Sequence, residues 1–136
     1  MNIRVGREGF MAYASFEDLE VWKRSTKLAI RLYQLLKGCH DLGLKDQITR
    51  SAVSIPSNIA EGAERGTSAE FIHFLHIAKG SAAELRTQLY IATQLGIVDI
   101  KVGSELSGEL KELSSMLQGL ILSLKPIFDS RNVIIM

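Results

Sequence analysis

The sequence predicts an all-α protein folded as an antiparallel up-down-up-down four-helix bundle. Two observations support this prediction. Apolar residues recur at steps of three and four in four separate stretches, the period of a helix face that packs against other helices. Short connections rich in glycine and capping residues join the stretches, which favours antiparallel neighbours. The bundle is expected over residues 16–128, after a flexible N-terminal arm at 1–15 and before a C-terminal tail at 129–136.

The first helix is expected from Phe16 to about Lys37, with Ser15 as its N-cap and Gly38 after its end. Its predicted core face holds Val21, Leu28, Leu32, Leu35 and Leu36, flanked by Trp22, Ala29 and Tyr33. A separate arc of the same helix is cationic, and we call it the basic arc. It consists of Lys23, Arg24, Lys27, Arg31 and Lys37.

The second helix is expected to start near Leu44 and to end before Gly66, with a bend at Pro56, whose ring nitrogen cannot donate a hydrogen bond. Its apolar seam is Leu44, Ile48, Ala52, Ile55, Ile59 and Ala63. A polar row runs beside this seam through Gln47, Ser51, Ser54, Asn58, Glu61 and Arg65. The residues that we assign to an oligomer or helix interface are Gln47, Arg50, Ser54, Asn58, Glu61 and Arg65.

The third and fourth helices have the clearest boundaries. Thr67 and Glu70 form a capping box that starts the third helix, and Gly96 closes it. Its seam is Phe71, Leu75, Ala78, Ala82, Leu85, Leu89 and Ala92. Asp99 or Ser104 is expected to cap the fourth helix, whose seam is Leu106, Leu110, Leu113, Leu117, Leu120 and Leu124.

Composition limits the possible functions. The 136 residues suit one domain, and 16 basic against 15 acidic residues leave a net charge of +1, so any nucleic-acid surface must be local. The only cysteine, Cys39, excludes a disulfide within the chain and fits a reducing cytoplasm. No apolar run approaches the roughly 18 residues of a membrane span, so no membrane partner is expected.

Catalytic and metal-binding patterns are weak. The Glu70-x-x-His73 spacing matches an element of di-metal bundles, but it occurs once and Glu70 is better explained as the capping-box residue. Cys39 has only His40 beside it, and no serine has a base and an orienting acid in a recognisable arrangement. We therefore expect no catalytic residue, no metal and no cofactor.

Two binding features remain, each with two interpretations. The basic arc could contact successive phosphates, or it could be a solvated face in which Glu20 pairs with Arg24. The polar row could form a contact between subunits with close backbone approach at Gly62. It could also be a half-buried edge inside the chain, with Glu61 paired to Arg65.

The chain resembles the four-helix-bundle proteins associated with intervening sequences in bacterial 23S rRNA genes. The most specific segment runs from Ser54 to Gly62 with the following Arg65. The other matching positions are Phe16-Glu17-Asp18-Leu19, Val21-Trp22, Leu44, Gln47, Arg50, Phe74-Leu75, Ile77-Ala78-Lys79-Gly80-Ser81 and Glu84-Leu85. The resemblance implies a ring, typically a homopentamer, and kinship with retroelement accessory proteins that bind nucleic acid and a reverse transcriptase. Those accessory proteins are more basic than this chain.

Together these features lead to one leading hypothesis and two others. The leading hypothesis is a non-enzymatic oligomer that binds RNA or DNA through the basic arc. The alternative is a helical scaffold that binds another protein without nucleic acid. A metalloenzyme is the third.

Overall fold

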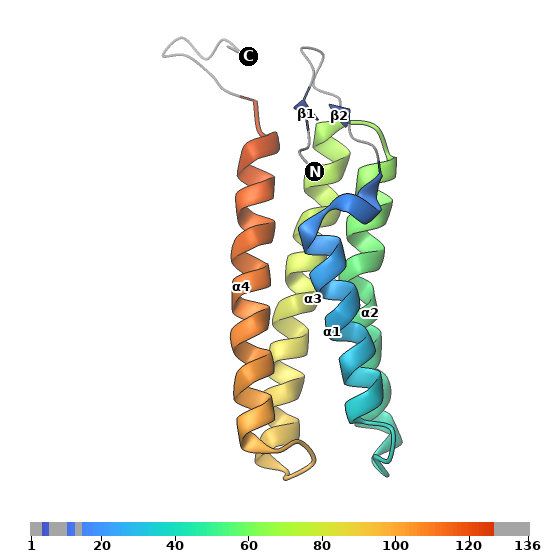
Figure 1. Ribbon diagram of the computed structural model, residues 1–136, viewed down its shortest axis with the longest axis vertical. Coiled ribbons are helices and arrows are strands. Elements are labelled where there is room, and N and C mark those ends of the chain that lie inside the picture. The colour runs from blue at the N-terminus through green and yellow to red at the C-terminus, as the bar shows by residue number, and fades with distance from the viewer. Residues whose placement is uncertain (1–3, 6–10, 13–14, 127–136) are drawn as a thin grey trace.

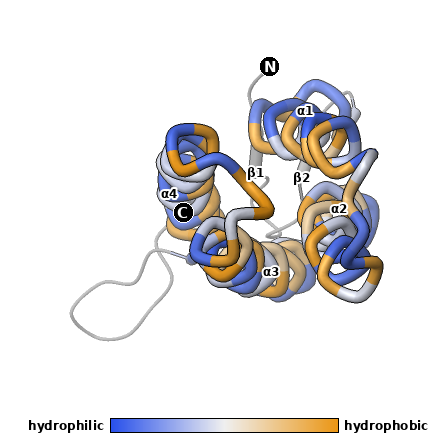
Figure 2. Tube along the Cα trace, turned by 90° about the horizontal axis from the view of Figure 1, so that it is seen from below, coloured by the Kyte–Doolittle hydropathy of each residue, from blue (hydrophilic) through white to orange (hydrophobic). Residues whose placement is uncertain are grey.

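The computed structural model describes residues 4–5, 11–12 and 15–126, and it confirms the four-helix all-α bundle. Four long helices lie side by side and alternate in direction, with a short connection at each reversal (Figure 1). Seen along their axes, they surround a common centre (Figure 2). Their bounds are α1 (Glu20–Leu35), α2 (Leu42–Glu64), α3 (Ser68–Gln94) and α4 (Ile100–Leu124).

The first helix begins later than predicted. Ser15 caps a single 3-10 turn, η1 (Phe16–Asp18), by accepting a hydrogen bond from the Glu17 backbone N–H at 3.2 Å. Leu19 then adopts an extended conformation with its side chain buried, and α1 starts at Glu20. The sequence pattern missed this break because Leu19 and Val21 both reach the core, so the apolar signal continues across it.

Two short strands, which the sequence analysis did not anticipate, precede η1. The strands β1 (Arg4–Val5) and β2 (Met11–Ala12) pair antiparallel, with Arg4 opposite Ala12 and Val5 opposite Met11. The remainder of the predicted arm and the predicted tail at 129–136 lie outside the described residues.

The helix ends follow local chemistry. Asp41, Thr67 and Asp99 are the N-caps of α2, α3 and α4, which confirms the capping role of Thr67 and selects Asp99 over Ser104. The capped helix α2 thus begins at Leu42, two residues before the predicted start. Gly66 and Gly96 follow α2 and α3 with φ of +86° and +75°, a conformation that a Cβ atom disfavours. The first helix ends at Leu35, before Gly38.

The predicted seams form the core almost completely. Every seam residue of α3 is buried, and so are the seams of α2 and α4 apart from half-buried Leu44 and Leu120. In α4, Ile121 takes the buried place expected for Leu120. The prediction for α1 was less accurate, because Leu35 and Tyr33 are exposed while Ser25 is buried and donates a hydrogen bond to the Trp22 carbonyl. Pro56 lies inside α2 and is buried.

Gly62 marks a close approach of α2 to α3. A Cβ atom at this position would lie 2.6 Å from the Phe74 Cβ and 3.1 Å from Phe71 Cδ1. The Phe74 Cβ is attached directly to the backbone, so it cannot yield without moving α3. The close approach that the sequence suggested at Gly62 is therefore a contact within one chain.

We expect Gly62→Ala to be less stable than Gly80→Ala by about 2 kcal/mol, measured as the free energy of unfolding in urea. Overpacking costs about 1–3 kcal/mol, whereas alanine gains about 1 kcal/mol over glycine at a free helical position. Gly80 is the matched control, since it is exposed in α3 and a Cβ atom there meets nothing within 4 Å. Equal stability of the two variants would contradict the close approach.

Candidate functional site

The basic arc does not form one free cationic surface. Arg24 and Arg31 reach across to α4, where Arg24 lies 2.8 Å from a Glu112 carboxylate oxygen and Arg31 lies 3.0 Å from a Glu105 oxygen. Glu20 pairs with Lys23 at 3.6 Å. The predicted Glu20–Arg24 pair is therefore wrong, because Arg24 has a carboxylate partner on another helix.

These cross-helix pairs change the electrostatics of all four groups. The hydrogen bond from Arg24 and the nearby positive charge lower the pKa of Glu112, and Arg31 lowers the pKa of Glu105 in the same way. Hydrogen bonds to Glu112 and Glu105 raise the pKa values of Arg24 and Arg31 against a smaller effect of desolvation. The pairs thus tie α1 to α4, two helices that touch each other less than the other adjacent pairs do.

The lysines of the arc are differently placed. Lys27 and Lys37 are exposed, and neither has an ion-pair partner among the described residues. Lys23 is also exposed, beside Glu20. Of the five cations predicted to bind nucleic acid, only these three lysines face solvent without an ion-pair partner on α4.

The polar row of α2 divides into an inner part and an outer part. The Ser54 hydroxyl lies 2.8 Å from that of Ser81 on α3, and the Asn58 side-chain amide donates to the Ser54 carbonyl at 2.8 Å and to its hydroxyl at 3.0 Å. Ser51 is buried. For these residues the structure favours the interpretation as a half-buried edge inside the chain.

The outer part of the row remains at the surface. Arg65 pairs with Glu61 at 3.0 Å, as predicted, and its guanidinium lies 5.0 Å from the centre of the Phe74 ring. Arg50 pairs with Asp46 at 2.8 Å, and Gln47 is exposed. These side chains do not converge on one another.

The residues considered for metal binding are also separate. The Thr67 hydroxyl accepts from the Glu70 backbone N–H at 3.2 Å, which confirms the capping box. His73 is exposed, with its ring edge-on to Phe74 at 5.2 Å between centres. In the described ranges, no three His, Cys, Asp or Glu residues gather closely enough to hold a metal ion.

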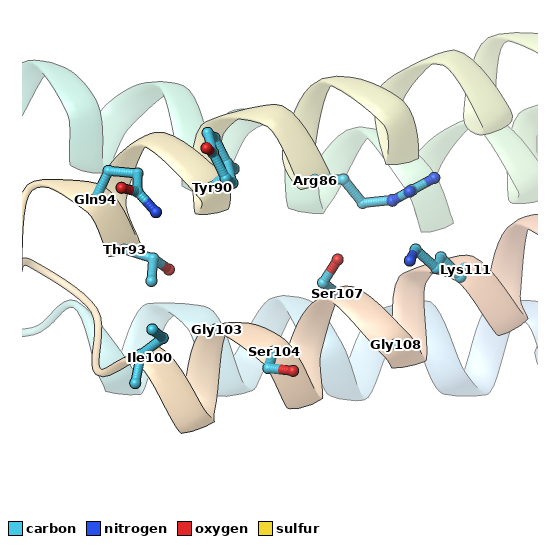
Figure 3. A pocket seen from close by; sticks show the side chains of 10 residues that line it. All are labelled: Arg86, Tyr90, Thr93, Gln94, Ile100, Gly103, Ser104, Ser107, Gly108 and Lys111. Atoms are coloured by element: carbon cyan, nitrogen blue, oxygen red, sulfur yellow. The ribbon is translucent and has the colours of Figure 1, made fainter.

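Two surface grooves were missed by sequence reasoning. An apolar groove of about 360 Å³ between α1 and α2 is lined by Thr26, Ala29, Ile30, Tyr33, Gln34, Val53 and Pro56. A groove of about 460 Å³ between α3 and α4 is lined by basic, polar and apolar residues (Figure 3). Its lining residues are Arg86, Tyr90, Thr93, Gln94, Ile100, Gly103, Ser104, Ser107, Gly108 and Lys111. The spacing of Arg86, Tyr90 and Thr93, at steps of four and three outside the α3 seam, was the available signal for the second groove.

Residues 17–119 match the family model of the 23S rRNA-intervening sequence protein. The chain belongs to this family. It is also similar to a crystal structure from Bacteroides thetaiotaomicron, described as a protein of unknown function from the S23 ribosomal protein family. That similarity has a TM-score of 0.70 and 26% sequence identity, and it covers 74% of this chain and 97% of the other.

No curated protein matches the sequence. Within the described part of this family member, no helix is long and apolar enough to cross a bilayer.

We expect the Arg24–Glu112 pair to stabilise the bundle at neutral pH and to lose that effect in acid. Because the folded-state pKa of Glu112 is lowered, the contribution is complete above the ordinary carboxyl pKa of about 4.3 and disappears as the pH falls through the lowered value. The difference in free energy of unfolding between the native protein and Glu112→Gln should thus be largest near pH 7 and shrink below about pH 4.

Urea unfolding at pH 7 and pH 3 measures this difference. Glu84→Gln is the matched control, because Glu84 is exposed on α3 and has no ion-pair partner in the described structure. A Glu112→Gln effect of equal size at both pH values would show that the ion pair is not its cause.

Proposed function

We propose that this family member is a non-enzymatic helical scaffold that works by self-association, with the apolar groove between α1 and α2 as its contact surface. One observation carries the proposal. Ile30, Tyr33 and Val53 are 53%, 51% and 40% exposed, and all three line this groove. Apolar side chains that gather on one surface mark contact sites more often than scattered ones do.

A second copy of the chain is the proposed occupant. A separate set of exposed apolar side chains lies on the outer face of α3 and at its C-cap: Ile77, Ile91 and Leu95. In the end-on view, the outer side of α1 and α2 and the outer side of α3 point in different directions (Figure 2). Contact between two different surfaces of identical subunits is heterologous, and it closes into a ring when the rotation permits. Five subunits is the number implied by the family resemblance.

Binding of RNA or DNA by α1 is a second candidate function. Its support is the exposure of Lys23, Lys27 and Lys37, which a ring would repeat around its circumference. Against it stand the carboxylate partners of Arg24 and Arg31 and the net charge of +1. Binding of a different protein, and the cytoplasmic location suggested by Cys39, stay predictions.

We expect the protein to elute as an oligomer, with a light-scattering mass near five times that of one chain. Ile30→Glu should release monomers of unchanged helicity, because it places a carboxylate in the apolar groove. Leu122→Glu is the matched control, since Leu122 is also exposed but lies on α4 outside this groove, and it should keep the native mass.

Light scattering at micromolar concentration, with circular dichroism to check folding, decides the outcome. A monomeric native protein would overturn the proposal of self-association. An oligomer that survives Ile30→Glu but dissociates with Leu122→Glu would place the contact elsewhere on the bundle.

A further inference from the structure

We propose that the groove between α3 and α4 binds a phosphate ester with a flat apolar body, such as a nucleotide unit, either free or within a single strand. This site goes beyond the proposed scaffold role and lies on other helices than the α1–α2 groove. Figure 3 shows Arg86 extending along the groove from α3, while Ser107 and Lys111 extend from α4. The ligand would place its phosphate at this end of the groove.

Charge is the first argument. The ten lining residues include two cations, Arg86 and Lys111, and no carboxylate. Lys79 lies two helical turns before Arg86, and its Nζ donates a hydrogen bond of 2.6 Å to the side-chain oxygen of Gln118 on α4. Because Gln118 is neutral, this contact does not neutralise the charge of Lys79. By contrast, the arginines between α1 and α4 are paired with glutamates. In a chain with a net charge of only +1, positive charge is thus left locally in excess along the α3–α4 groove.

The state of Arg86 is the second argument. Its side chain is half-buried, and its Nε atom is buried without a hydrogen-bond partner in the described part of the chain. A buried donor without a partner destabilises the folded state, because it has lost its hydrogen bonds to water. A phosphate can accept two parallel hydrogen bonds from one guanidinium, including that of Nε, once the side chain adjusts. The nearby Ser107 hydroxyl can donate a further bond, and Lys111 adds charge.

The shape of the groove is the third argument. Away from the two cations it is bordered by Tyr90 and Ile100, which are 66% and 70% exposed. An exposed aromatic ring in a groove that also holds cations offers a stacking surface to a planar group, as in many sites for single-stranded nucleic acid. The volume of about 460 Å³ falls within the usual range for small-ligand sites. The groove therefore has a cationic end and an aromatic end.

The experiment measures binding to the full-length protein with three probes: inorganic phosphate, AMP, and a fluorescein-labelled 12-nucleotide single-stranded DNA. We expect AMP or the DNA to bind more tightly than inorganic phosphate. The double variant Arg86→Gln/Lys111→Gln should weaken that binding at least tenfold. For the DNA, it should also make the plot of log K against log salt shallower by about 1.4, the value for two lost phosphate contacts on a single strand.

Two further variants test whether binding depends on the groove itself or only on the total charge of the protein. Lys27→Gln/Lys37→Gln removes the same charge from α1 and the turn that follows it, and should leave binding within twofold of native. Gly108→Leu narrows the groove without altering charge, since a Cβ atom at Gly108 meets nothing within 4 Å, and it should weaken AMP binding. Thermal melting checks that each variant is folded.

The outcomes are distinct. Binding of AMP identifies a free nucleotide as a ligand, whereas binding of the DNA alone identifies a strand. The proposal is overturned if inorganic phosphate binds as tightly as either, if no probe binds, or if the α1 variant loses as much affinity as the groove variant. Ile30→Glu should bind the probes normally even as a monomer, so the scaffold proposal and this site can fail separately.

Discussion

The close packing of α2 against α3 is the constraint on which the rest of the structure depends. These two helices share the most extensive contact in the bundle, and small residues permit it. Gly62 meets Phe71 and Phe74, while Ala78 and Ala82 are fully buried on the facing seam. Side chains of this size let helix axes approach closely, and the approach leaves little room for polar groups without partners.

Hydrogen bonds between polar side chains complete the contact between α2 and α3. Ser54, Asn58 and Ser81 satisfy one another at the edge of the α2–α3 interface, so polar atoms can remain half-buried there without a large desolvation cost. The segment from Ser54 to Gly62, which is the most specific part of the family resemblance, therefore has a structural role within one chain.

The two sides of α4 explain where free charge remains. One side carries Glu105 and Glu112 towards the arginines of α1, and the other carries Ser107 and Lys111 along the groove with α3. The first side neutralises the two arginines of the basic arc and leaves its three lysines exposed. The second side meets Arg86, and no residue lining that groove supplies a carboxylate. One helix thus separates a paired electrostatic contact from a cationic groove.

The sequence by itself determined the four helices, the capping box of α3 and nearly all of the buried seams, because these depend on periodicity and on interactions within a few residues. Thr67 with Glu70 and the leucines of α4 are examples. Only the tertiary structure decided the partners of long charged side chains. Arg24 and Arg31 find glutamates 88 and 74 residues away, beyond the reach of any local pattern. The two grooves are likewise set by helix packing, which brings together residues that no sequence spacing relates.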